Sequence, residues 1–134
     1  MSETSGNRSE VPFERIGGEA AVRRLVDCFY DHMDTLADAT ELRALHPASL
    51  DGSRDKLAWY LTGWMGGPQV YVQKFGHPRL RARHLPFPIG VLERDQWMMC
   101  MRRALAETVA DAELRAFLDG NFDRLADHMR NQPG

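Results

Sequence analysis

The sequence predicts a single all-α domain, and three observations lead to that prediction. Apolar residues recur with helical period along almost every segment between residues 12 and 130. No segment shows the strict alternation that is typical of a strand, and glycine and proline interrupt the periodic segments at short intervals. The length of 134 residues fits one domain. We expect this domain to span residues 12–130, between a polar, disordered arm at 1–11 and a flexible tail at 131–134.

Four substantial helices follow from the spacing of apolar residues. The first begins just after Gly17-Gly18 and buries one stripe, made of Val22, Leu25, Val26, Phe29, Met33 and Leu36. A short piece at 41–46 stops before a proline, and the next helix runs from about 53 to 65, with Ser49 or Asp51 as a candidate cap. A long helix over 91–110 presents Trp97, Met101, Leu105 and Thr108 on one side. A last helix, capped by Asp111, directs Leu114, Phe117, Leu118, Phe122, Leu125 and Met129 inward.

The stretch 66–90 is different, because glycines and prolines exclude a long helix there. Pro78 suits the first turn of a short helix on which Leu80 and His84 share one face. A compact bundle seldom carries so long an irregular stretch unless the stretch has a function or packs against something. A flat apolar cofactor would be such a partner.

Charge and composition exclude several classes of function. The formal net charge is −2, which argues against nucleic acid or an anionic membrane surface as the main partner. No apolar run approaches 18 residues, and the N-terminus is polar, so we expect neither a membrane span nor a secretory signal, and a cytoplasmic location. Cys28 and Cys100 are expected to be reduced, buried small hydrophobes, and the absence of Cys-x-x-Cys and His-Glu-x-x-His argues against a structural zinc site.

His84 differs from the other four histidines in its surroundings. It ends the short helix behind Arg79, Arg81 and Arg83, and the apolar run Leu85-Pro86-Phe87-Pro88-Ile89 follows it. An imidazole between cations and rigid apolar residues suits a haem edge, since haem iron takes a neutral imidazole nitrogen and guanidinium groups pair with carboxylates. By themselves the arginines read more simply as a solvated helix face.

The same residues carry a family resemblance that extends over about residues 12–130. The run from Gly76 through His84 to Ile89, followed by Glu93-Arg94-Asp95-Gln96-Trp97, resembles the proximal half of a group II truncated haemoglobin. Four further pieces are similar to the same family, namely Ile16-Gly17-Gly18, Phe29-Tyr30, Arg43-Ala44-Leu45-His46-Pro47 and Trp64-Met65-Gly66-Gly67-Pro68.

The resemblance implies a truncated globin, a two-over-two helical sandwich that holds one haem b (iron protoporphyrin IX) per chain. It implies His84 as the proximal iron ligand and Arg83, then Arg79, as propionate partners. The residues expected against the porphyrin are Phe87, Ile89, Leu80, Leu57, Leu61 and Met101. The expected distal set is Tyr30, His46, Trp97 and Phe29, with Ser53 at the usual distal-histidine position. Apart from the resemblance, core packing is the simpler interpretation of Tyr30 and Trp97.

These assignments predict a pentacoordinate-type iron that binds O2, CO or NO, and we extend the list to peroxide and cyanide. Donors aimed at O2 would slow its release, which suits redox chemistry or scavenging. Two alternatives stay open. One is a nitric oxide dioxygenase or peroxidase that needs an external electron donor or reductase. The other is a haem-free helical interaction domain. Either a monomer or a homodimer is compatible with the sequence.

Overall fold

The computed structural model describes residues 11–133, and every regular element in this range is helical. The elements are α2 (Pro12–Ile16), α3 (Gly18–Thr35), the 3-10 turn η1 (Ala37–Ala39), α4 (Thr40–Ala44), α5 (Asp51–Trp64), α6 (Val70–Phe75), α7 (Leu80–His84), α8 (Val91–Thr108) and α9 (Ala112–His128). The all-α prediction is therefore confirmed for the described range. Of the predicted disordered arm, residues 1–10 lie outside the described residues.

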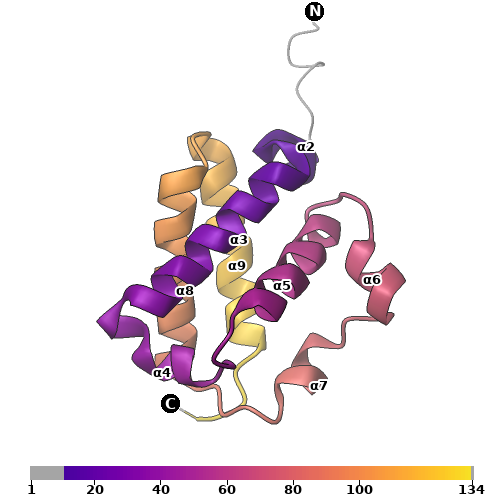
Figure 1. The fold of residues 1–134 in the computed structure, drawn as a ribbon. Coiled ribbons are helices and arrows are strands. Elements are labelled where there is room, and N and C mark those ends of the chain that lie inside the picture. The colour runs from indigo at the N-terminus through magenta and orange to yellow at the C-terminus, as the bar shows by residue number, and fades with distance from the viewer. Residues whose placement is uncertain (1–10, 134) are drawn as a thin grey trace, which may run out of the picture.

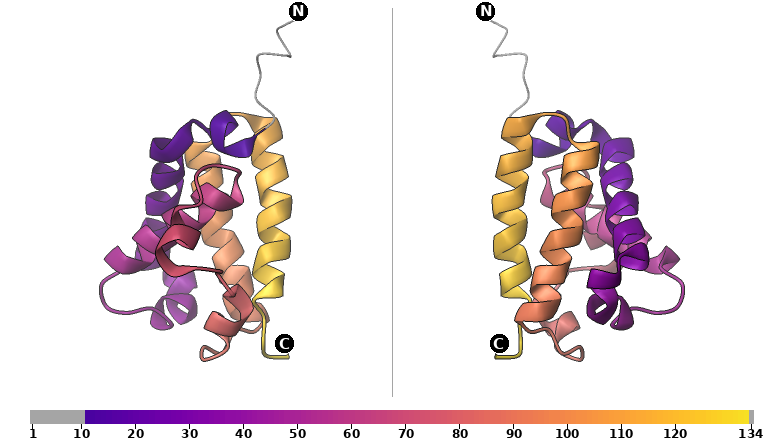
Figure 2. Two further views of the ribbon diagram at one scale, coloured as in Figure 1. Left: turned by 90° about the vertical axis from the view of Figure 1, so that its right-hand side faces the viewer. Right: turned by 90° about the vertical axis from the view of Figure 1, so that its left-hand side faces the viewer.

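Four long helices form two crossed pairs, α3 with α5 and α8 with α9 (Figure 1). The side views show α8 and α9 lying next to each other along their length, with α2 across one end (Figure 2). The core lies between the pairs because each helix turns an apolar stripe toward it. Its largest fully buried side chains are Phe29, Phe122, Leu25, Met33, Leu61, Met65, Met98, Met101, Leu105, Leu114, Leu118 and Val22.

Two glycine pairs set the start of α3 and the end of α5. Gly17 and Gly18 both have positive φ, at 117° and 79°, which lets the chain turn sharply between α2 and α3. A Cβ at Gly67 would lie 2.7 Å from the ring of Phe13, so only glycine allows α2 to settle against the end of α5. The Phe13 N–H donates to the Met65 carbonyl at 2.9 Å and fixes this contact.

Several expected boundaries differ from the structure. Helix α5 begins at Asp51 and its N-cap is Leu50, which forms no side-chain cap bond, so both proposed caps, Ser49 and Asp51, are wrong; the Ser49 hydroxyl only accepts from the Asp51 N–H at 3.3 Å. Pro78 precedes α7 instead of lying in its first turn, because Arg79 adopts a left-handed φ of 48° before the helix starts. Within the irregular stretch the six-residue helix α6 was not expected.

In α9 the inward assignment of Phe117 is wrong, since this side chain is 55% exposed. Leu114, Leu118 and Phe122 do form the buried stripe, and Phe117 lies off that stripe, one residue before Leu118. The Asp111 side chain accepts from the Leu114 N–H, as expected of the cap.

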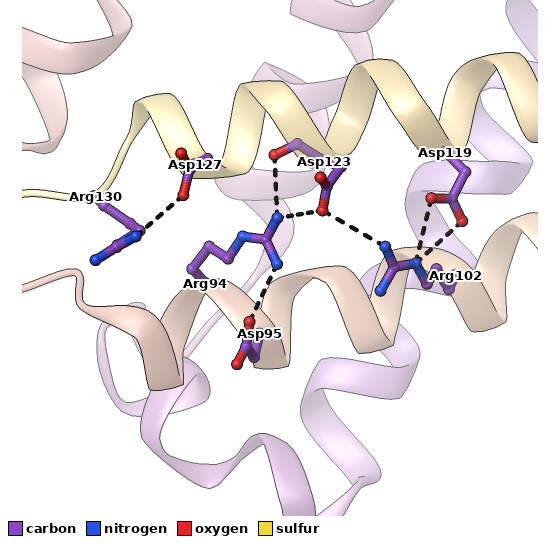
Figure 3. Close-up of polar contacts among 7 residues, drawn as sticks. All are labelled: Arg94, Asp95, Arg102, Asp119, Asp123, Asp127 and Arg130. Carbon is purple, nitrogen blue, oxygen red and sulfur yellow. Dashed lines mark hydrogen bonds and ion pairs between the residues drawn. The ribbon is translucent and has the colours of Figure 1, made fainter. Parts of the chain in front are cut away.

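A row of ion pairs joins the outer faces of α8 and α9 (Figure 3). Arg94 pairs with Asp123 and with its neighbour Asp95, and Arg102 pairs with Asp119 at 3.1 Å and with Asp123 at 3.5 Å. Such partly exposed pairs contribute little energy individually. Both arginines lie on α8, and Asp119 and Asp123 lie on α9. Their pairing across the two helices favours one register of α8 against α9.

The first residue of the expected flexible tail is bonded to the loop that follows α7. The Asn131 side chain donates to the carbonyls of Phe87 (2.8 Å) and His84 (3.2 Å) and accepts from the Ile89 N–H (2.9 Å). The Asn131 N–H donates to the Ile89 carbonyl at 2.8 Å. The chain after α9 therefore holds the loop between α7 and α8.

Candidate functional site

The position and bonding of His84 suit a metal ligand. Its Nδ1 lies 2.6 Å from the carbonyl oxygen of Leu80, one turn earlier in α7. A carbonyl can only accept, so Nδ1 carries the proton and, in the neutral ring, Nε2 carries the lone pair. This bond orients the half-buried ring and leaves the Nε2 lone pair free to coordinate a metal.

The three arginines around His84 have different surroundings. Arg81 donates to the carbonyls of His128 and Arg130 and so ties α7 to the end of α9. Arg83 is exposed and its guanidinium lies 5.9 Å from the ring centroid of Tyr71, while Arg79 is exposed at the start of α7. Neither Arg83 nor Arg79 pairs with a carboxylate in the described part of the chain, so both are available to an anionic group.

Apolar side chains around α6 and α7 are left open to solvent. Four of the six large hydrophobic residues that are clearly exposed come from this region, namely Val72 (40%), Phe75 (42%), Leu85 (58%) and Phe87 (43%). Of the other expected porphyrin contacts, Ile89, Leu80 and Leu57 are half-buried, whereas Leu61 and Met101 are fully buried in the core. An exposed apolar patch of this kind marks a binding surface, and a flat apolar ligand would cover it.

The predicted distal aromatic residues lie together. The ring centroid of Phe29 is 4.9 Å from that of Tyr30 and 5.1 Å from that of Trp97. The ring of His46, just after α4, is 6.0 Å from that of Tyr30 in an edge-on arrangement. Ser53 lies half-buried in the first turn of α5, and within residues 11–133 it forms no hydrogen bond with these four.

Two hydrogen-bond donors in this cluster lack partners. Tyr30 is 6% exposed, and neither its hydroxyl nor the indole N–H of the half-buried Trp97 bonds to any group in the described range. Burial raises the pKa of Tyr30 well above its ordinary value of 10, more than the nearby Arg54 lowers it, so the hydroxyl keeps its proton at neutral pH. Neither atom is among the fully buried side-chain atoms that lack a partner in the described range, so both donors reach open space and are available to a ligand.

His46 is held as a neutral ring. Burial lowers its pKa below 6.5, and the charges of Arg43 and His84 lower it further, against the opposite effect of the Leu42 carbonyl. That carbonyl lies 3.0 Å from Nδ1. The proton of the neutral ring therefore sits on Nδ1, and Nε2 can only accept. The structure therefore favours His46 as a hydrogen-bond acceptor at neutral pH.

Sequence reasoning missed two residues that hold the site in place. Gln96 is 7% exposed and accepts from the Leu42 N–H at 2.9 Å while donating to Glu41 at 2.7 Å, which anchors α4 and hence His46 on α8. The signal that could have identified Gln96 is its polar amide side chain among the buried residues of α8. Asn131, described above, anchors the loop after His84, and no local pattern marked it.

These features meet the requirements of a haem site. Within residues 11–133 there are an imidazole nitrogen at His84 that is free to coordinate, two arginines without carboxylate partners, several exposed apolar side chains around α6 and α7, and two donors without partners at Tyr30 and Trp97. The residues present therefore fit the group that the resemblance implied. The part of the chain that the structure describes contains no helix that is long and apolar enough to cross a membrane.

Comparison with known proteins leads to the same family. The bacterial-like globin family matches residues 12–131. The group 2 truncated haemoglobin YjbI of Bacillus subtilis is 39% identical over 127 residues, which cover 95% of this chain and 93% of that protein. The structure superposes on the group II two-on-two haemoglobin of Agrobacterium tumefaciens with a TM-score of 0.90 and 51% identity, covering 98% and 99% of the two chains. It also matches the truncated oxygen-avid haemoglobin of Bacillus subtilis, with a TM-score of 0.84, 38% identity, and 91% and 100% coverage. The chain therefore belongs to the bacterial-like globin family, as a group II truncated haemoglobin.

Proposed function

We propose that this chain binds one haem b and uses it to hold O2 with slow release. The observation that carries the proposal is the pair of hydrogen-bond donors on Tyr30, which is buried, and Trp97, which is half-buried; neither has a partner in the described range. Slow release is supported by the relative from Bacillus subtilis that is described as oxygen-avid. Membership of the globin family supports the haem.

In this proposal α7 and the surrounding residues hold the haem. His84 coordinates through Nε2, because its Nδ1–H is engaged by the Leu80 carbonyl. Arg83, and then Arg79, pair with the two propionates. The apolar side chains of Phe87, Ile89, Leu80 and Leu57 contact the ring, whereas Leu61 and Met101, which the sequence also suggested, have no exposed surface and pack in the core. When bound, the haem supplies the iron that takes up a diatomic ligand and passes electron density to it.

The distal residues then act on that ligand. Tyr30 and Trp97 donate hydrogen bonds to it, and each bond to a charged acceptor contributes on the order of 1–3 kcal/mol. Each 1.4 kcal/mol corresponds to about a tenfold slower release. The neutral His46 ring lies edge-on to Tyr30, with ring centroids 6.0 Å apart, and helps to hold the Tyr30 ring in position.

A visible absorption spectrum of the purified full-length protein tests the haem, followed by stopped-flow measurement of O2 release. We expect a haem spectrum that changes on addition of CO or O2, and O2 release that is at least tenfold faster in Tyr30→Phe than in the native protein. A chain that takes up no haem would overturn the proposal in favour of a haem-free interaction domain. A haem protein whose O2 release is fast and unaffected by Tyr30 would overturn the retention mechanism alone.

A further inference from the structure

A second cluster of ligand-type side chains joins α3 to α8, and none of its members has a role in the proposed haem site. Cys28 and His32 lie four residues apart on α3, and Glu107 lies in the last turn of α8. The His32 Nε2 is 2.7 Å from one carboxylate oxygen of Glu107, and the Cys28 Sγ donates to the other at 3.5 Å. We propose that Cys28, His32 and Glu107 form a binding site for a divalent transition-metal cation of the zinc type.

The spacing of the three side chains is close to what coordination requires. Their ligand atoms all lie within 4.8 Å of one another. Zinc binds sulfur at about 2.3 Å and nitrogen or oxygen at about 2.0–2.2 Å, so neighbouring ligands of a tetrahedral site lie roughly 3.3–3.8 Å apart. The i, i+4 spacing of Cys28 and His32 places both on one face of α3, opposite Glu107. Rotations of side chains are therefore sufficient, without movement of either helix.

The types of ligand select the cation. A thiolate together with an imidazole excludes Mg²⁺ and Ca²⁺, which prefer oxygen ligands, and favours Zn²⁺ among the common divalent ions. Three protein ligands leave one tetrahedral position to water, and Glu107 faces solvent with 55% of its side chain exposed. Burial and the hydrogen bond to Glu107 raise the pKa of Cys28 to about 11, so a cation has to displace the thiol proton as it binds.

A simpler interpretation is an ordinary ion pair between His32 and Glu107, with Cys28 beside it. The two interpretations differ in the role of sulfur. An ion pair does not need Cys28, whereas in a zinc site the thiolate is the ligand that a serine cannot replace. A bound cation would also cross-link α3 and α8, the helices that carry Tyr30 and Trp97, and would raise the unfolding temperature as the concentration of free cation increases.

The test is a titration of the full-length protein, reduced and freed of metal, with zinc chloride. Calorimetry should give one zinc per chain, and X-ray absorption at the zinc edge should show one sulfur at about 2.3 Å with nitrogen and oxygen at about 2.0–2.2 Å. Cys28→Ser, His32→Gln and Glu107→Gln should each weaken binding at least tenfold. His128→Gln and Cys100→Ala, which lie outside the cluster, should leave it unchanged.

The visible absorption spectrum and the circular dichroism of each variant serve to show that the fold is retained. Stoichiometric zinc with sulfur in its shell, lost in Cys28→Ser, supports the site. Failure to bind zinc at one per chain, an absorption edge without sulfur, or undiminished binding in Cys28→Ser would overturn it and leave the His32–Glu107 ion pair as the whole role of the cluster. Since no residue of the site belongs to the proposed haem pocket, these outcomes do not depend on haem.

Discussion

Replacing Tyr30 by phenylalanine removes one oxygen atom from a residue that is 6% exposed and keeps the ring that packs 4.9 Å from Phe29. In the ligand-free protein the Tyr30 hydroxyl has no partner in the described range. This hydroxyl is not among the fully buried atoms that lack a partner, so its removal relieves little desolvation cost. We therefore expect the free energy of unfolding of the ligand-free variant to change by less than about 1 kcal/mol.

With O2 bound, we expect Tyr30→Phe to be unfavourable, because it weakens the binding of the ligand. The variant loses a donor to a ligand that carries negative charge, and a loss of about 1.4 kcal/mol corresponds to a tenfold faster release. CO carries little charge, so its release should change much less. Stopped-flow mixing measures both rates, and chemical denaturation of the ligand-free protein measures stability. Tyr60→Phe is the matched control, because Tyr60 is a half-buried tyrosine that lies beside Tyr71, with ring centroids 6.2 Å apart.

A second donor in the same cluster provides an internal check. Trp97→Phe should also speed O2 release, and the double variant should depart from additivity because neighbours in one hydrogen-bond network are coupled. If O2 release is unchanged in Tyr30→Phe while stability falls, the hydroxyl serves the protein itself, and the argument from its missing partner is refuted.

Three other predictions follow from the same geometry. His84→Gly should lose the normal haem spectrum, and added imidazole should restore it. His128→Gly should keep the spectrum. An unaltered ferrous spectrum in His84→Gly would contradict the assignment of His84 as the iron ligand. Arg83→Ala should speed haem transfer to an acceptor globin several-fold and Arg79→Ala less so, and equal rates in both would show that their ranking is wrong. Because the pKa of His46 is lowered in the folded state, the unfolded state binds its proton first, so the free energy of unfolding should fall as the pH drops below 6.5 and level off once the folded state is also protonated. His46→Gln should flatten this slope in a pH series of denaturation curves, and a slope equal to that of the native protein would contradict the buried neutral ring.

The spacing of apolar residues was sufficient to predict the helices that bury a single apolar stripe. The i, i+3, i+4 spacing in α3 identified its buried face, because an amphipathic helix turns its apolar stripe toward the core and leaves the opposite side in solvent. The same reasoning failed at Phe117, since α9 borders solvent on its far side and an aromatic residue one position from the stripe faces water. It also missed α6, a helix of only six residues that ends at Gly76.

The sequence indicated which residue types form the candidate site, but it did not indicate their protonation states. His84 stood out through its neighbours, whereas the proton on its Nδ1 follows from a carbonyl one helical turn away. His46 was assigned by resemblance. The low pKa of its ring depends on burial and on the charges of Arg43 and His84. Protonation depends on distance and dielectric environment, which no sequence pattern records.

By itself, the sequence determined the helical class and the long helices and predicted a ligand at His84, because each of these depends on residues within a few positions of one another. Only the tertiary structure decided which distant groups meet. Glu107 reaches Cys28 and His32 across 75 or more positions, Gln96 anchors Leu42 across 54, and Asn131 reaches His84 across 47. Such contacts depend on how α3, α8 and α9 cross. That crossing is set by the packing of whole helix faces and leaves no mark in the spacing of any one segment.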